Sequence, residues 1–174
     1  VLDPFLWGLF PLLRKFERKY KNFSYEFVMG GLIGNYEEFL PKNFREKNSL
    51  DLGNKILYDM YRATATITKM PGFKNPPELF TEDYKSSYPL DKYFLAFKEI
   101  DEENSPAYMR KILQEAIIFG KNIYELDVER EILKSFHVDF DEFVFNYENS
   151  HDIFLANRME AFDYRICLLY TSPS

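Results

Sequence analysis

The fold class that this sequence predicts is decided by residues 23–29, Phe-Ser-Tyr-Glu-Phe-Val-Met. Large apolar side chains alternate there with smaller or polar ones. This alternation is typical of a β-strand that buries one face, and Gly30-Gly31 directly after it ends the pattern. A single strand cannot pair its own backbone polar groups, so we expect the neighbouring strands to lie outside this sequence or in another chain.

Helical periodicity dominates on both sides of this stretch. Before it, residues 6–21 have apolar residues at helical spacing with basic residues between them. After it, the same spacing predicts five or six helices in succession. We expect Asp139 and Glu142 to form a capping box and Ser150 to cap the last helix. A short helical turn is expected around Tyr36 to Leu40, and the expected later helices begin near Ser49, Leu90, Ser105, Asp127, Asp139 and Ser150.

Composition excludes several classes of site. With 174 residues, 46% hydrophobic content and a net charge of −6, the chain is long enough for one core and has little affinity for polyanions. Cys167 is the only cysteine, so an intramolecular disulfide is impossible. His137 and His151 lie far apart in the sequence, and we interpret both as solvated or capping residues. We therefore expect no metal, no cofactor and no nucleic-acid partner.

The two ends of the sequence are unusual. The chain starts at Val1 without a methionine, and its tail from Cys167 resembles translated sequencing-adapter read-through. We expect the chain to be truncated at both ends and residues 166–174 to be a non-native tail. No stretch has the length of a membrane span and no signal peptide is evident. We expect a cytoplasmic protein that does not bind membranes.

The opening residues resemble those of a known family. The segment Asp3-Pro4-Phe5-Leu6-Trp7-Gly8 resembles the active-site turn of DsbA-family dithiol oxidoreductases, a branch of the thioredoxin superfamily. In that family, Asp-Pro is followed by Cys-x-x-Cys, an aromatic residue and glycine. Three later segments resemble the same family in the same order, namely residues 28–32, 70–73 and 85–89. The resemblance extends over residues 3–165.

This resemblance implies an α/β, thioredoxin-like fold with a large helical insertion. We expect a mostly helical fragment with one clear strand, in which Val1-Leu2 ends a preceding strand. Residues 1–31 would be the N-terminal part of the thioredoxin-like domain, and residues 32–165 the helical insertion with its return helix. The final strands and helix of the core would follow residue 165.

The family's chemistry requires a dithiol that this chain lacks. The first cysteine of the pair lies at a helix N-terminus, where the helix dipole favours the thiolate. Here Phe5, Leu6 and Trp7 occupy the turn between Pro4 and Gly8, without cysteine. Either a sequence error has removed the pair or the protein has lost it. No catalytic residue is assigned, and Asp3, Pro4, Phe5, Leu6, Trp7 and Gly8 mark the degenerate turn.

Three functions follow from the resemblance. The first is a thiol:disulfide oxidoreductase or isomerase acting on protein or small thiols, so whether this chain is an enzyme stays open. The second is a non-catalytic adaptor that binds a protein partner through exposed Phe5 and Trp7, since aromatic residues serve as binding anchors. The third is a relative of the kappa-class glutathione transferases and hydroxychromene carboxylate isomerases, although no serine lies between Asp3 and Phe10.

Overall fold

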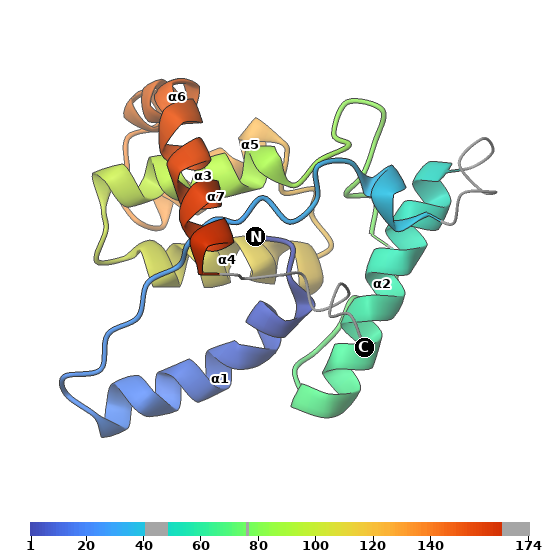
Figure 1. Ribbon diagram of the computed structural model, residues 1–174, viewed down its shortest axis with the longest axis horizontal. Helices are drawn as coiled ribbons and strands as arrows, with labels where there is room; N and C mark the ends of the chain where they lie inside the picture. Colours follow the sequence, from blue (N-terminus) through green and yellow to red (C-terminus); the bar gives the residue numbers. More distant parts are fainter. Residues whose placement is uncertain (41–48, 76, 165–174) are drawn as a thin grey trace.

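The computed structural model describes residues 1–40, 49–75 and 77–164 (Figure 1). These residues form helices and loops, with no β-strand among them. The predicted helices are confirmed, but the α/β fold class with one clear strand is wrong for the described residues. The elements are α1 (Pro4–Lys19), η1 (Tyr36–Phe39, a short 3-10 helix), α2 (Ser49–Thr68), α3 (Tyr88–Ile100), α4 (Ser105–Ile117), α5 (Leu126–Lys134), α6 (Phe140–Asn149) and α7 (His151–Asp163).

Residues 23–29, the predicted strand, form no β-ladder with any described segment, and the chain continues from them to Ile33. Residues 23–33 run along α3 in the antiparallel direction, with Phe27 beside Phe94 and Ile33 beside Ser87. A strand requires a ladder of hydrogen bonds to a neighbouring strand, and no other described segment supplies one. Val1-Leu2 has no strand partner either. Burial follows the predicted alternation from Phe23 to Phe27, where the odd-numbered side chains are half-buried and Ser24 and Glu26 are exposed, but Val28 is half-buried and breaks it.

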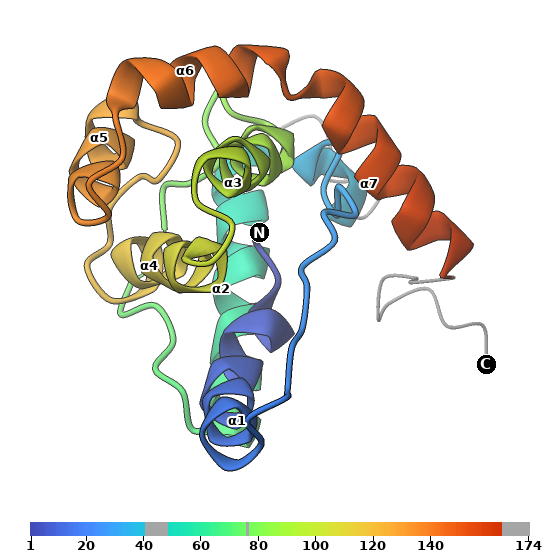
Figure 2. The same cartoon turned by 90° about the vertical axis from the view of Figure 1, so that its left-hand side faces the viewer.

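Helix α3 lies at the centre of the larger group of helices. It packs against α4, α6 and α7, and Figure 2 shows α5, α6 and α7 arching around it. Its apolar residues Leu90, Phe94 and Phe97 are almost completely buried. The ring of Phe97 stacks on Tyr108 of α4 at 4.0 Å between centroids. These contacts bury large aromatic surfaces and stabilise the core.

Helices α1 and α2 pack against each other beside this group (Figure 1). Helix α1 also contacts α4, and Trp7 and Phe10 of α1 are buried. Helix α2 is anchored through Asn54, whose amide group exchanges two hydrogen bonds of 2.9 Å with the backbone of Phe80. The start of α1 is therefore fixed between α2 and the larger group.

Two predicted helix caps had different outcomes. Asp139 is the N-cap of α6, and its Oδ1 accepts a hydrogen bond from the Glu142 backbone N–H at 2.9 Å, which is half of the expected capping box; the Glu142 side chain makes no return bond to the Asp139 N–H. Ser150 is the N-cap residue of α7 as expected, but its side chain makes no capping hydrogen bond, because its hydroxyl donates to the Tyr147 carbonyl at 2.7 Å. Ser150 is buried where α6 and α7 meet, so its hydroxyl bonds the preceding turn. The expected tail, residues 166–174 with Cys167, lies outside the described residues.

Candidate functional site

The degenerate turn forms the first turn of α1. Asp3 is its N-cap, and Asp3 Oδ1 accepts hydrogen bonds from the backbone N–H groups of Phe5 at 2.7 Å and Leu6 at 3.3 Å. Pro4 is the first helical residue, where its missing N–H costs nothing. Because free N–H groups and the helix dipole meet here, this position stabilises a negative charge. The carboxylate of Asp3 occupies it.

Trp7 attaches this first turn to the loop after α2. Its indole Nε1 donates a hydrogen bond of 2.7 Å to the carbonyl oxygen of Pro71. The indole is only 5% exposed and packs edge-on against Phe10. The expectation of Trp7 as an exposed binding anchor is therefore wrong, because its ring and its N–H are both used inside the protein.

Gly8 allows α1 and α2 to approach closely. A Cβ atom at Gly8 would lie 2.4 Å from the Thr68 methyl group, Cγ2. The Thr68 side chain is fixed, because its hydroxyl donates to the Thr64 carbonyl at 2.9 Å and accepts from the Met70 N–H at 3.3 Å. The glycine of the turn thus has a packing role here.

The turn leaves an apolar stripe exposed on α1. Phe5, Leu9 and Leu12 recur at helical spacing and are 37%, 45% and 45% exposed. Their spacing places them on one face of the helix. No described residue covers this face fully, so the stripe is the exposed apolar surface nearest the turn.

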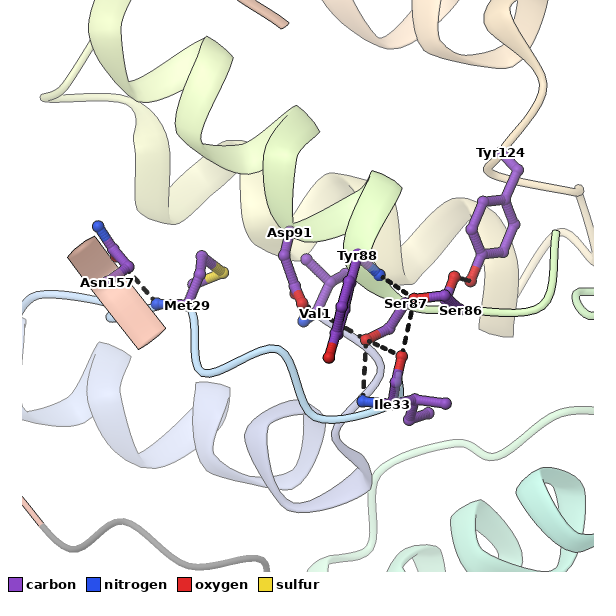
Figure 3. Close-up of polar contacts among 9 residues, drawn as sticks. All are labelled: Val1, Met29, Ile33, Ser86, Ser87, Tyr88, Asp91, Tyr124 and Asn157. Carbon is purple, nitrogen blue, oxygen red and sulfur yellow. Dashed lines mark hydrogen bonds and ion pairs between the residues drawn. The ribbon is translucent and has the colours of Figure 1, made fainter. Parts of the chain in front are cut away.

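Two further regions from the family resemblance meet where Ile33, which follows residues 28–32, contacts Ser86 and Ser87 (Figure 3). The Ser87 N–H donates to the Ile33 carbonyl at 2.9 Å, and the Ile33 N–H donates to Ser87 Oγ at 3.2 Å. The Ser86 hydroxyl also donates to the Ile33 carbonyl at 2.9 Å, and Tyr124 donates to the Ser86 carbonyl at 2.8 Å. Ile33, the residue after the 28–32 segment, is thereby held against the start of α3.

Asp91 was missed by the sequence reasoning and links the chain start to α3. Its Oδ1 lies 2.5 Å from the nitrogen of Val1, and its Oδ2 lies 3.4 Å from the Ser87 hydroxyl. Asp91 is 1% exposed. A buried carboxylate needs such partners. An acidic residue between apolar Leu90 and Tyr93 was the signal that could have identified it.

The buried hydroxyl of Tyr61 lies near enough to the turn to be affected by the charge of Asp3. Tyr61 Oη has no hydrogen-bond partner among the described residues, and its ring packs edge-on against Phe73 at 4.9 Å. Burial raises the pKa of Tyr61 far above its ordinary value, and the negative charge of Asp3 raises this pKa further. Tyr61 is therefore a neutral phenol that offers no acid or base near the turn.

The other candidate residues do not come together in one site among the described residues. His137 and His151 are both exposed, and Asp139 is occupied as a helix cap. In residues 1–40, 49–75 and 77–164, no cluster of His, Cys, Asp or Glu suits a metal ion. No helix in these ranges combines the length and apolar character needed to cross a membrane. Among the described residues, the first turn of α1 and its contacts are the candidate site.

Comparison with known proteins gives a match in fold. No protein-family model matches the chain, and no curated protein does. The chain shares its fold with a candidate protein disulfide isomerase from Nitrosomonas europaea. The superposition has a TM-score of 0.73 and covers 96% of this chain and 76% of that chain, at 13% sequence identity. At this identity the likeness concerns the fold alone.

Proposed function

We propose that this chain is a DsbA-like thiol:disulfide oxidoreductase or isomerase whose catalytic dithiol is absent from the present sequence. The observation that supports this proposal most directly is the capped first turn of α1. Asp3 accepts hydrogen bonds from two backbone N–H groups there, and Trp7 attaches the turn to Pro71 by a further hydrogen bond. The fold shared with the Nitrosomonas europaea protein supports the proposal. We also propose that residues 1–31 belong to the thioredoxin-like part and residues 32–165 to the insertion.

The chemistry follows from the position that Asp3 occupies. A cysteine thiolate there would accept the same N–H groups, and the helix dipole would lower its pKa. The thiolate attacks a substrate disulfide, forms a mixed disulfide and releases one substrate thiolate. A second cysteine then attacks the mixed disulfide and releases the other thiolate, so the substrate is reduced and the protein oxidised. Protein disulfides or small disulfides fit this reaction.

Introducing the dithiol tests this proposal. Asp3→Cys with Leu6→Cys gives Cys-Pro-Phe-Cys at the start of α1, in a Cys167→Ser background. We expect this variant to form an internal disulfide in oxidised glutathione and to catalyse insulin reduction with reduced glutathione. The controls are Asp3→Cys alone, which lacks the second thiol, and the parent chain, which lacks both. A double variant that reduces insulin no faster than the single variant would contradict the proposal.

A second candidate function is a non-catalytic adaptor that binds a protein partner. The exposed stripe of Phe5, Leu9 and Leu12 favours it, because contiguous apolar side chains on a surface mark binding sites. Phe5→Ser with Leu9→Ser tests this role, since both side chains are exposed and their loss leaves the fold intact. Unchanged recovery of a partner identified with the parent chain would exclude the stripe as the binding surface.

A further inference from the structure

Helix α5 is attached to the other helices by a small buried surface. It packs against α4, and Figure 2 shows it at the outer end of the arch. Of its nine residues, Glu129, Ile132 and Leu133 are the buried ones. After the helix, the ring of Phe136 packs edge-on against Phe97 of α3 at 5.1 Å. One of the three buried side chains of α5 is therefore an acid, and an element with few buried contacts is among the first parts of a fold to open.

The environment of this acid suits only its neutral form. Tyr108 of α4 donates from Oη to Glu129 Oε1 at 2.6 Å, and Glu129 Oε2 has no hydrogen-bond partner among the described residues. In the same part of the chain, no lysine, arginine or histidine forms an ion pair with this carboxyl. Burial strongly destabilises a carboxylate that has neither a cation nor enough hydrogen bonds. Ionisation of Glu129 therefore acts against the contact between α5 and α4.

The other titratable groups at this interface keep their charge state. The groups that interact with Glu129 from neighbouring helices are the phenols of Tyr93 on α3 and Tyr108 on α4. Burial is the main cause that raises the pKa of both phenols above the ordinary value, and the charge of Glu129 raises it further, so both stay neutral. Burial also raises the pKa of the Glu129 carboxyl, from its ordinary 4.5 to about 8, although the hydrogen bond from Tyr108 lowers it. Glu129 is thus the group at this interface whose charge responds in that range.

The chain on both sides of α5 is fixed independently of it. Before α5, Ile123 and Tyr124 are completely buried, and the Tyr124 hydroxyl donates to the Ser86 carbonyl at 2.8 Å. After α5, His137 has a φ of 58°, a left-handed conformation in which the chain reverses before α6. Helix α6 is anchored in turn by Phe143, which is completely buried. Helix α5 can therefore leave α4 while both flanking segments stay attached.

We propose that α5 is a pH-operated cover on the stacked rings of Phe97 and Tyr108, which opens locally when Glu129 ionises. In the open state the carboxylate is hydrated, so water compensates its charge. Opening releases one proton, so the opening equilibrium rises by at most about tenfold per pH unit between the two pKa values of Glu129. The open state exposes the apolar side of α5 and the ring stack beneath it. This device involves α3, α4 and α5, so it is independent of any redox role of the first turn of α1.

Hydrogen exchange of the whole chain, followed peptide by peptide with mass spectrometry, tests this inference. Exchange in α5 and in α3 is measured between about pH 5 and about pH 9 and divided by the intrinsic exchange rate at each pH. We expect the protection of α5 to fall by at most about tenfold per pH unit up to about pH 8 and then to level off.

Urea at low concentration separates local opening from global unfolding, which releases the same proton. Urea accelerates exchange in proportion to the surface that an opening exposes. The protection of α3 should therefore fall with urea, whereas the protection of α5 should be lower from the start and nearly independent of urea.

Three variants assign the effect to the carboxyl. Glu129→Gln keeps an acceptor for the Tyr108 hydroxyl but cannot ionise, so the protection of α5 should no longer depend on pH. Glu129→Leu also lacks a titrating group and should give the same flat profile if the amide of the first variant disturbs the fold. His137→Asn is the control, because it removes an exposed imidazole, a group that ordinarily titrates in the same range, and it should keep the slope of the parent.

Two results would overturn the inference. Protection of α5 that is independent of pH in the parent, or that depends on pH equally in the parent and in both Glu129 variants, would show that this carboxyl does not control the contact. Equal protection and equal urea dependence of α5 and α3 would show that α5 opens only when the whole chain unfolds.

Discussion

The indole N–H of Trp7 donates to the carbonyl oxygen of Pro71 at 2.7 Å, across 64 positions of the sequence. The bond joins two segments that the family resemblance identifies separately, the turn at the start of α1 and the loop after α2. It also turns the indole into the protein, where it packs against Phe10. The geometry of the first turn therefore depends on a contact with a loop.

Removing this bond should loosen the site without unfolding the chain. Trp7→Phe retains an aromatic ring but deletes the donor and leaves the Pro71 carbonyl unpaired. We expect the free energy of unfolding to fall by about 1–2 kcal/mol, from the lost hydrogen bond and the smaller buried surface. Urea denaturation measures this. Phe5→Leu, an exposed change in the same turn, is the control and should cost less than about 0.5 kcal/mol. Equal effects of the two changes would contradict the anchoring role.

Asn54 should be one of the most sensitive polar residues of α2. Its amide donates to the Phe80 carbonyl and accepts from the Phe80 N–H, both at 2.9 Å, and it is 8% exposed. Asn54→Ala leaves a buried donor and a buried acceptor unpaired, which should cost about 3 kcal/mol in urea denaturation. Lys55→Ala removes only an exposed ion pair with Asp59, so it should cost under about 0.5 kcal/mol. A cost for Asn54→Ala below about 1 kcal/mol, the net value of one hydrogen bond, would mean that water replaces both bonds.

Helices were predictable from the sequence because their signal is local. The spacing of Leu90, Phe94 and Phe97 encodes a buried face whichever helix covers it, and the Asp139 cap depends on residues within one turn. The alternation in residues 23–27 correctly predicted which side chains face away from solvent, although Val28 is also half-buried. It did not predict the state of the backbone, because a strand is defined by a neighbouring strand that no local pattern contains.

The candidate site could likewise be predicted only in part from the sequence. The residues of the turn were named from their likeness to a family. Their environment was not predictable, since Trp7 meets Pro71 and Gly8 meets Thr68 only after α1 and α2 have packed. Apolar residues in a sequence indicate that a helix has a buried face, but they do not show whether a given tryptophan faces the core or the solvent.

Glu129 should make stability depend on pH. It is completely buried on α5, Tyr108 of α4 donates to its Oε1 at 2.6 Å, and its Oε2 has no partner among the described residues. Burial raises the pKa of the Glu129 carboxyl from its ordinary 4.5 to about 8, although the hydrogen bond from Tyr108 lowers it. The folded state therefore keeps the carboxyl protonated at pH values where the unfolded chain releases the proton.

This difference in the protonation of Glu129 determines whether stability rises or falls with pH. Unfolding releases a proton between pH 4.5 and about 8, so the contribution to stability is complete below this window and is lost as the pH rises through it. The slope should be at most about 1 kcal/mol per pH unit. Urea denaturation between pH 5 and about 8 measures it, and Glu129→Gln, which cannot ionise, should flatten the profile. A parent profile that matches the Glu129→Gln profile would show that the carboxyl is hydrated and ionised in the fold.

Gly8 and Thr68 should behave as a coupled pair. In an open helix, Gly8→Ala would add about 0.5–1 kcal/mol of stability, because alanine restricts the unfolded chain. Here the added methyl would lie 2.4 Å from Thr68 Cγ2, and the Thr68 hydroxyl bonds resist a rotation that would relieve the clash. We therefore expect Gly8→Ala to cost about 1–2 kcal/mol in the parent chain. Thr68→Ser removes the methyl and keeps the hydroxyl, so Gly8→Ala should become neutral or stabilising in that background. Urea denaturation of the four proteins gives the coupling free energy by a double-mutant cycle. A coupling near zero would mean that α1 and α2 are farther apart than the contact between Gly8 and Thr68 indicates.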